Sequence, residues 1–213
     1  MDLPVFQDNL RSSSGWLAEL EREKSVWIGM IARDRDRALD SIRVLAGDRV
    51  ERALELVSGW AREDQPVLSV ERLKELHSTL TGEDEGLRLV DAKSFIDQHD
   101  PAPPVLLPRF LENAFDWFGT PSFNEIHPVE QASLVLLRLR DLEPFPSLND
   151  ETALRAASFY TERAGFPPLI IFDDTDTQVR YRKALEAAFR MLTQPLVEFL
   201  AEMLTRTIRT VAK

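Results

Sequence analysis

Cysteine is absent from all 213 residues of the chain. Its absence excludes disulfide bonds and zinc sites built on thiolates. It is consistent with a reducing compartment, and we expect the protein to be cytoplasmic. Histidine is also scarce, with three residues at His77, His99 and His127, none at the spacing of a known ligand set. We therefore predict neither a bound metal nor a cofactor.

Glycine is sparse too, with 8 residues in the chain. No G-x-x-x-x-G-K-[S/T], G-x-G-x-x-G or G-x-S-x-G motif occurs. These patterns mark phosphate-binding loops, dinucleotide-binding folds and serine hydrolases respectively. The sequence carries none of these three signatures.

Long apolar runs and an excess of basic residues are both lacking. No stretch is long and apolar enough to predict a membrane span, and the first residues lack the layout of a secretory signal. The chain has 26 Lys and Arg against 36 Asp and Glu, a formal net charge of −10. A surface of this sign disfavours nucleic acid, whose backbone requires a basic face, and anionic membranes.

Helical periodicity dominates what is present. The apolar spacing predicts helices over residues 14–46, 48–60, 69–80, 108–118, 127–142, 149–164, 178–193 and 195–211. Residues 87–90, which read Leu-Arg-Leu-Val, predict a short strand or hairpin arm, and the apolar run 169–172 predicts a short buried strand or an apolar lead-in. We expect an all-α fold with a small β-hairpin or flap. Residues 1–66 would form an N-terminal helical region packed on residues 67–213 as one unit.

Local signals mark several helix ends. Ser69 is a candidate N-cap and Gly82 a candidate C-terminal stop. Pro128 suits a first helical position, which places the helix start at His127. Asn149 is a candidate N-cap for the following helix. The alternating charges of Arg33 to Arg37 predict a solvated helix face.

The segment from Glu143 to Leu154 reads E-P-F-P-S-L-N-D-E-T-A-L and resembles the active-site loop of the Fic family. That family's pattern is H-P-F-x-[D/E]-G-N-G-R, which transfers a nucleotide or phosphate group to a protein hydroxyl. The residues retained from this pattern are Pro144, Phe145 and Asn149. The substituted positions are Glu143 for the histidine, Ser147 for the acid, Leu148 and Asp150 for the glycines, and Glu151 for the arginine.

Further landmarks of the same family lie along most of the chain in the expected order. They are Leu76-His77, Gly86-x-Arg88, the prolines at 101, 103, 104 and 108, His127-Pro128, Gly165-Phe166-Pro167-Pro168, and Tyr181 to Phe199. An inhibitory helix motif of the family, [S/T]-x-x-x-E-[G/N], resembles residues 24–29. There Gly29 is retained and Ile28 replaces the inhibitory glutamate.

The resemblance implies four chemical requirements, and the substitutions affect each. Glu143 has a low ordinary pKa for a general base at neutral pH, although burial could raise it. Ser147 is a poor sole ligand for Mg²⁺. Leu148 carries a Cβ that disfavours the left-handed backbone of a glycine nest. Asp150 and Glu151 place two negative charges where phosphates would dock, so we expect no ATP binding in the family manner.

Three functions remain open. The leading hypothesis is a catalytically degenerate Fic-like protein, a pseudoenzyme that binds or regulates another protein. Its contact surface would lie near residues 86–104 and the loop 143–151. The first alternative is a protein nucleotidyltransferase with altered chemistry that uses Glu143 as the base. The second is a sensor whose vacated pocket holds a small neutral or cationic ligand. The oligomeric state is left open.

Other candidates favour structural roles. His99 lies in a polar segment and is expected in an exposed loop. Residues 173–176 read Asp-Asp-Thr-Asp but lack the glycine and glutamate of a calcium loop, so a solvated turn is expected. Trp117 is expected in the core, whereas Trp16, Trp27 and Trp60 are compatible with core or interface.

Overall fold

The computed structural model describes residues 14–47, 50–64, 67–94, 96 and 99–213. Its helices, in chain order, are α2 (Ser14–Arg33), α3 (Arg35–Ala46), α4 (Glu51–Trp60), α5 (Val70–Thr81), the 3₁₀ turn η2 (Pro104–Leu106), α6 (Leu107–Phe118), α7 (Pro121–Asn124), α8 (Pro128–Leu142), α9 (Asn149–Arg163), α10 (Thr175–Phe189) and α11 (Gln194–Val211). The expected helical fold is confirmed.

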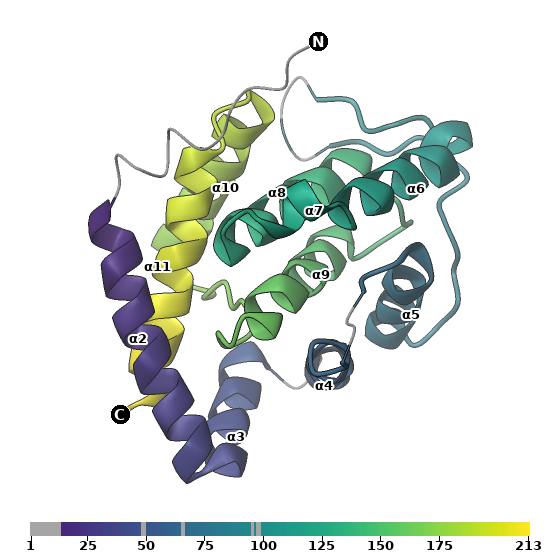
Figure 1. Ribbon diagram of the computed structural model, residues 1–213. Coiled ribbons are helices and arrows are strands. Elements are labelled where there is room, and N and C mark those ends of the chain that lie inside the picture. Colours follow the sequence, from purple (N-terminus) through teal and green to yellow (C-terminus); the bar gives the residue numbers. More distant parts are fainter. Residues whose placement is uncertain (1–13, 48–49, 65–66, 95, 97–98) are drawn as a thin grey trace.

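Helices α8 and α9 form the centre of the molecule (Figure 1). Every residue of α9 from Thr152 to Thr161 is buried, so this helix has no solvent face in its middle turns. Small residues at Ala153, Ala156 and Ala157 let neighbouring helices approach closely. Helix α8 packs along α9, with α4 and α5 also against α9, and α6 against α8.

The flank of the molecule is built from both ends of the chain. Helix α2 lies beside α11, and α11 in turn packs against α10 and α8 (Figure 1). The α2–α11 interface is joined by Arg209 of α11, whose guanidinium lies 2.6 Å from Glu19 and 2.9 Å from Glu23. No described helix combines the length and the apolar character needed to cross a bilayer.

Most predicted helix boundaries lie close to the observed ones. Ser69 caps α5 by accepting from the Arg72 amide, and Gly82 ends that helix at φ 82°. His127 caps α8 through its side chain, with Pro128 in the first turn as expected. The predicted start at Asp48 lies outside the described residues.

The single helix predicted over residues 14–46 is wrong, because it is broken at Asp34. Asp34 leaves helical geometry at φ −154°, and its carboxylate accepts from the Arg37 amide. The carboxylate thus caps a second helix where the charge pattern predicted a continuous solvated face. The break lets α3 turn away from α2 (Figure 1).

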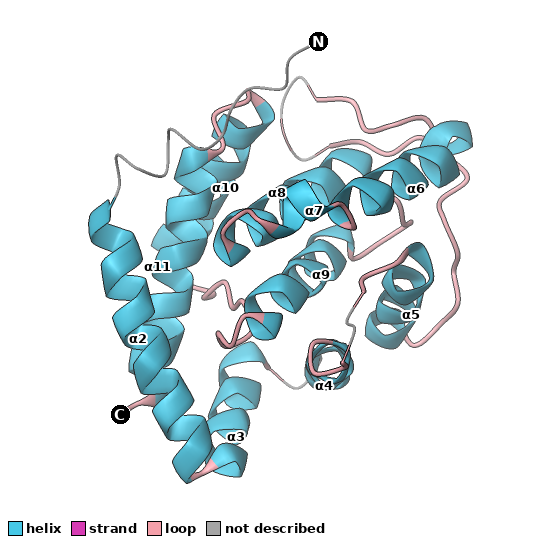
Figure 2. Ribbon diagram, viewed as in Figure 1, coloured by secondary structure: helices cyan, strands magenta, loops and turns pink. Residues whose placement is uncertain are grey.

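The predicted strands are wrong, since no described residue is in a strand (Figure 2). The backbone near residue 169 bonds to α9 instead of a second strand, with the Leu169 amide donating to Ser158 Oγ at 2.9 Å. The Arg88 amide likewise donates to the Pro144 carbonyl at 2.9 Å. In each segment a backbone amide is thus paired with a helix or loop atom and not with a neighbouring strand.

The tryptophan prediction is also corrected. Trp117 is 38% exposed and covers Phe123 with its edge, whereas Trp27 and Trp60 are 5% and 6% exposed. Trp117 lies on the outer side of α6, because Leu111, Ala114 and Phe118 take the inward positions of that helix.

Candidate functional site

The loop between α8 and α9, residues 143–148, joins the two central helices and is the candidate site. Two of its residues have left-handed backbone conformations although neither is glycine. Glu143 has φ 41° and ψ 64°, and Leu148 has φ 51° and ψ 27°. A side chain in this region costs roughly 1–2 kcal/mol. Leu148 thus adopts the left-handed conformation that its Cβ was expected to disfavour, and surrounding contacts must offset that cost.

Arg88 is the principal contact that holds the loop. Its side chain is 3% exposed. Its Nε donates to the Glu143 carbonyl at 2.6 Å, and its Nη2 donates to the Leu142 carbonyl at 3.2 Å. The same guanidinium donates to Val90 O at 2.8 Å and to Ala102 O. One buried cation therefore ties residues 88–102 to the end of α8 and the start of the loop.

Asn149 stabilises the loop from its other end, but not as the predicted N-cap. Leu148 occupies the N-cap position, and Asn149 is the first helical residue. The Asn149 side chain instead accepts from the Phe145 amide at 2.9 Å and donates to the Phe145 carbonyl at 2.8 Å. The oxygen and the nitrogen of the Asn149 side chain both bond to the backbone of Phe145, and this fixes the distance across the loop.

His77 of α5 supports the loop from below. Its ring stacks on Phe145 with centroids 3.9 Å apart and planes 6° from parallel, and Nε2 lies 3.1 Å from the Ser147 carbonyl. Burial lowers the pKa of His77, so the neutral ring with a proton on Nε2 fits this contact. The sequence identified His77 as a landmark of the family resemblance but did not predict that its ring would stack on Phe145.

The substituted residues of the loop are paired with the protein's own side chains. Asp150 accepts from the Tyr181 hydroxyl at 2.8 Å and lies 3.1 Å from Arg140 Nε. Glu151 lies 2.8 Å from Arg155 Nε. Both carboxylates are in the first turn of α9, as predicted, where the positive end of the helix dipole favours them. The Arg155 side chain faces the interior and forms this ion pair through its Nε atom.

Glu143 is buried, with 6% of its surface exposed. Burial raises the pKa of its carboxyl, while the positive charges of Arg140, His99 and Arg88 oppose that rise. The carboxylate lies 3.7 Å from Arg140 Nη2. A carboxyl with a raised pKa can exchange a proton nearer to neutral pH than an exposed one.

Ser147 lies at the solvent-facing side of the loop and contacts Glu85 weakly, at 3.4 Å between Oγ and Oε2. No group of three metal-ligating side chains occurs among the described residues. An open pocket of about 540 Å³ lies on the α10 side of the loop. Its charged lining is Arg140, Asp150, Asp173 and Arg182.

His99 was expected in an exposed loop, and this prediction is wrong. Its ring packs against the ring of Phe189 in α10, with the two centroids 4.4 Å apart, and Nε2 lies 3.3 Å from the Asp141 carbonyl oxygen. The side chain is 17% exposed. Sequence reasoning missed the contact because it joins residues far apart in the chain.

The acidic run at residues 173–176 is the start of α10. Asp174 caps that helix by accepting from the Thr177 amide at 2.9 Å, and Arg206 of α11 donates to the same carboxylate at 2.9 Å. These contacts hold the pKa of Asp174 below its ordinary value. The segment is a helix cap paired with a neighbouring helix.

Ile28 and Gly29, the candidate inhibitory positions, do not meet the loop. Ile28 is 50% exposed and lines a pocket together with Gly165 and Phe166. Those two residues follow the C-terminal end of α9, whereas the loop 143–148 precedes its N-terminal end. The structure therefore does not bring Ile28 or Gly29 to the candidate site.

Comparison with known proteins gives one consistent result. No family model matches the chain. A curated relative, the protein adenylyltransferase Fic of Nematostella vectensis, is 28% identical over 163 residues. The aligned region covers 75% of this chain and 38% of that relative, so the chain spans well under half of the relative's length.

Solved structures share the fold. A Fic-domain-containing signalling protein from Bacteroides thetaiotaomicron is 20% identical with a TM-score of 0.70, over 78% of this chain and 70% of that one. The structure of IbpAFic2 covalently tethered to Cdc42 is 16% identical with a TM-score of 0.56, over 88% and 70%. The similarity to curated Fic relatives, together with the loop and its landmarks, supports membership in the Fic family, and the solved structures show that the fold is shared.

Proposed function

We propose that this Fic-family protein has lost nucleotide transfer and acts by binding another protein. One observation carries the proposal: the phosphate-facing end of α9 is filled by the protein's own paired carboxylates. Asp150 is held by Tyr181 and Arg140, and Glu151 by Arg155. A phosphate approaching this helix end would meet negative charge, and the cation nearest to it on α9, Arg155, is already paired with Glu151.

Electrostatics sets the scale of this obstacle. Two unit charges 4 Å apart interact by about 4 kcal/mol at an effective dielectric of 20. Pairing and solvent reduce the repulsion from Asp150, which is 53% exposed at its side chain. The interaction between a bound phosphate and these carboxylates remains repulsive. A phosphate could take the place of either carboxylate only if that carboxylate left its arginine partner.

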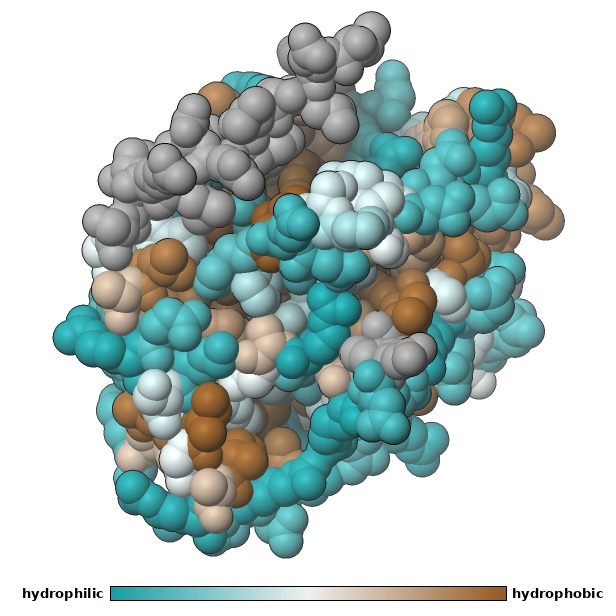
Figure 3. All heavy atoms as spheres, viewed as in Figure 1, coloured by the Kyte–Doolittle hydropathy of each residue, from teal (hydrophilic) through white to brown (hydrophobic). Residues whose placement is uncertain are grey.

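The surface beside the loop supports the protein-binding part of the proposal. Leu89, Val90 and Val105 are 90%, 73% and 83% exposed. We call these three residues the docking surface. Arg88 donates to the carbonyls of Val90 and Ala102, which holds the two segments together. Figure 3 shows hydrophobic atoms over the η2 and α6 end of the molecule, at the upper right.

The expected occupant of the docking surface is an extended segment of a partner protein with apolar side chains. Exposed apolar residues held on a rigid backbone lose little entropy when they bind. The solved relative IbpAFic2 is tethered to a protein, Cdc42. This supports a protein as the partner class without naming the partner of this chain.

Titration calorimetry with ATP and Mg²⁺ tests the loss of nucleotide binding. We expect no saturable heat at micromolar concentrations. Micromolar binding that depends on Mg²⁺ would contradict the proposal. Affinity capture with the intact chain tests partner binding, using Leu89→Asp with Val90→Asp against Val179→Asp, an exposed site on α10. The partner should be lost with the first variant and kept with the second.

The buried Glu143 favours one alternative, a transferase with altered chemistry. Its raised pKa makes the carboxyl a better proton acceptor near neutral pH than an exposed glutamate. A labelled-nucleotide transfer assay on lysate, comparing the protein with Glu143→Ala, separates the two functions. Label transfer that disappears in the variant would establish the alternative.

A further inference from the structure

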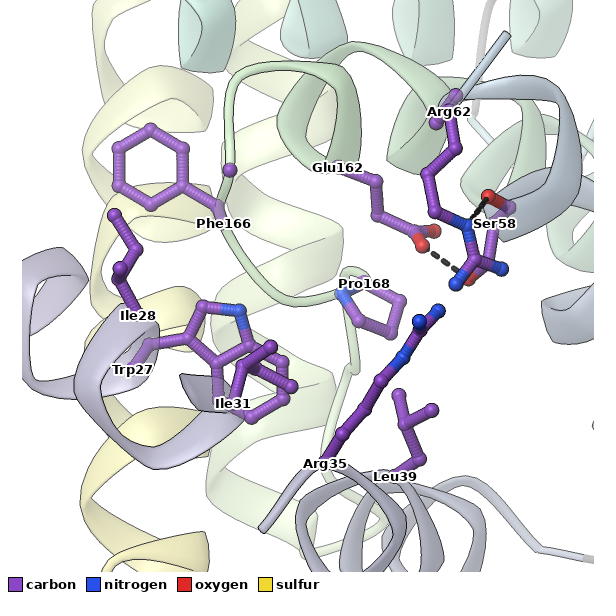
Figure 4. A pocket seen from close by; sticks show the side chains of 12 residues that line it. Trp27, Ile28, Ile31, Arg35, Leu39, Ser58, Arg62, Glu162, Phe166 and Pro168 are labelled. Atoms are coloured by element: carbon purple, nitrogen blue, oxygen red, sulfur yellow. Dashed lines mark hydrogen bonds between the residues drawn. The ribbon is translucent and has the colours of Figure 1, made fainter. Parts of the chain in front are cut away.

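A second pocket lies away from the site loop, among α2, α3, α4 and the residues that follow α9 (Figure 4). Its volume is about 300 Å³, at the lower end of the range for small-ligand sites, roughly 300–1,000 Å³. We call it the Glu162 pocket after the acidic residue in its lining. Nothing in the proposed function uses this space.

One wall of the Glu162 pocket is apolar. It is formed by Trp27, Ile28 and Ile31 of α2 together with Phe166 and Pro168. Trp27 and Phe166 are 5% and 3% exposed, so their positions are fixed by packing, whereas Ile28 is 50% exposed at the mouth. In Figure 4 the aromatic side chains lie on the side of the pocket opposite to the charged ones. An apolar group of a ligand would be held on this wall.

On the polar side of the pocket, one of the two oxygens of the Glu162 carboxyl group lacks a hydrogen-bond donor. Glu162 Oε2 accepts from the Ser58 hydroxyl. Glu162 Oε1 is buried and has no hydrogen-bond partner among the described residues. A buried acceptor without a donor costs roughly 1–3 kcal/mol, and more when it is charged. A ligand that brings an N–H donor would recover this loss.

Two arginines lie beside this carboxyl. Figure 4 shows the side chains of Arg35, at the start of α3, and Arg62, in the turn after α4, approaching Ser58 and Glu162. Arg62 Nε donates to the Ser58 carbonyl at 2.7 Å. Within the described residues, neither guanidinium forms an ion pair with a carboxylate. Their remaining N–H groups suit an anionic ligand group, for which arginine is the preferred partner.

The three features together select the ligand. A simple amine would satisfy Glu162 but meet repulsion from two guanidinium groups. A simple acid would satisfy the arginines but bring no N–H donor to Glu162. We propose that the Glu162 pocket binds a free amino acid with an apolar side chain. Its ammonium donates to Glu162, its carboxylate accepts from Arg35 and Arg62, and its side chain packs on Trp27 and Phe166.

The burial of Glu162 is consistent with a cationic ligand group beside it. Burial raises the pKa of Glu162 to about 7, and the Ser58 hydrogen bond and Arg155 oppose the rise. Arg35 and Arg62 line the same pocket, and the Lys24 ammonium lies 4.7 Å from the centre of the Phe166 ring. An ammonium brought to Glu162 favours the ionised carboxylate, so binding should release a proton near pH 7.

Titration calorimetry on the full chain tests the assignment with four probes: L-phenylalanine, L-leucine, 2-phenylethylamine and 3-phenylpropionate. We expect L-phenylalanine to bind at least about tenfold more tightly than its amine or its acid, a difference of about 1.4 kcal/mol. L-leucine should bind measurably. Equal affinity for the amine or the acid, or no heat from either amino acid at millimolar concentration, would overturn the proposal.

Variants test whether the heat measured by calorimetry comes from binding in the Glu162 pocket. Glu162→Gln should weaken L-phenylalanine binding at least about tenfold. Glu202→Gln, which removes an exposed partner of Arg180 on another face, should leave the affinity unchanged. Ile28→Trp, at the half-exposed mouth, should block binding while the circular dichroism and melting temperature stay close to wild type. Unchanged affinity in both pocket variants would show that the probe binds elsewhere.

Discussion

Replacing Arg88 with methionine tests how the site loop is held. Methionine keeps most of the apolar stem and removes the guanidinium, which donates to carbonyls of Glu143, Leu142, Val90 and Ala102. Hydrogen bonds that involve a charged group contribute about 1.5–3 kcal/mol each, but the guanidinium is 3% exposed and its desolvation offsets part of the sum. Removing one partner from a buried charged cluster typically costs about 3–5 kcal/mol.

We therefore expect Arg88→Met to lower the free energy of unfolding by about 3–5 kcal/mol. A domain with a total stability of about 5–15 kcal/mol would remain largely folded. The loss should be local as well, because the guanidinium joins residues 88–102 to the start of the loop. Two strained left-handed residues, Glu143 and Leu148, depend on such contacts to stay in place.

The assay combines urea unfolding with hydrogen exchange. Exchange should accelerate at residues 88–94 and 143–148 and stay unchanged in α11. The matched control is Arg182→Met, which removes an exposed cation 3.1 Å from Glu186 and should cost less than about 1 kcal/mol. If the two variants lost the same stability, or if exchange rose evenly over the chain, the reasoning would be refuted.

Three further predictions follow from the same structure. Met191→Gly should raise the free energy of unfolding by up to about 1 kcal/mol in urea melts, because Met191 is 75% exposed at φ 68°, and Met191→Ala should bring no such gain. Asn149→Ala should cost about 1–3 kcal/mol and speed amide exchange at Phe145, since two hydrogen bonds are lost; unchanged exchange there would contradict this. Burial raises the pKa of Glu162 to about 7, above its value in the unfolded chain, so its contribution to stability is present at low pH and is lost as pH rises towards 7. The stability of Glu162→Gln relative to wild type should rise by about 2 kcal/mol between pH 5.5 and pH 8, whereas parallel pH curves would refute this.

The sequence predicted those elements whose signals are local. Ser69 and Gly82 define α5 because capping and positive φ depend on neighbouring residues only. Pro128 marks the start of α8 for the same reason. The loop motif at residues 143–151 and its substituted positions are likewise readable directly from the chain.

Contacts between distant residues decided the rest. Leu148, in a left-handed conformation, takes the N-cap position that the sequence predicted for Asn149. The Asn149 side chain instead hydrogen-bonds to the backbone of Phe145. His99 packs on α10 instead of lying in solvent. The predicted strands are absent from the described residues, where the amides of Arg88 and Leu169 bond to loop and helix atoms of distant segments.

By itself, the sequence determined that the chain is acidic and helical in pattern, and it showed a loop that resembles the Fic motif with other residues at its charged positions. Helix caps, periodicity and residue identity depend on residues close together in the chain, so they can be recognised from the sequence alone. Only the tertiary structure decided that Asp150 and Glu151 are paired with Arg140 and Arg155, and that the Oε1 atom of Glu162 is buried without a donor. Burial and pairing depend on which helices meet, and no local pattern encodes that.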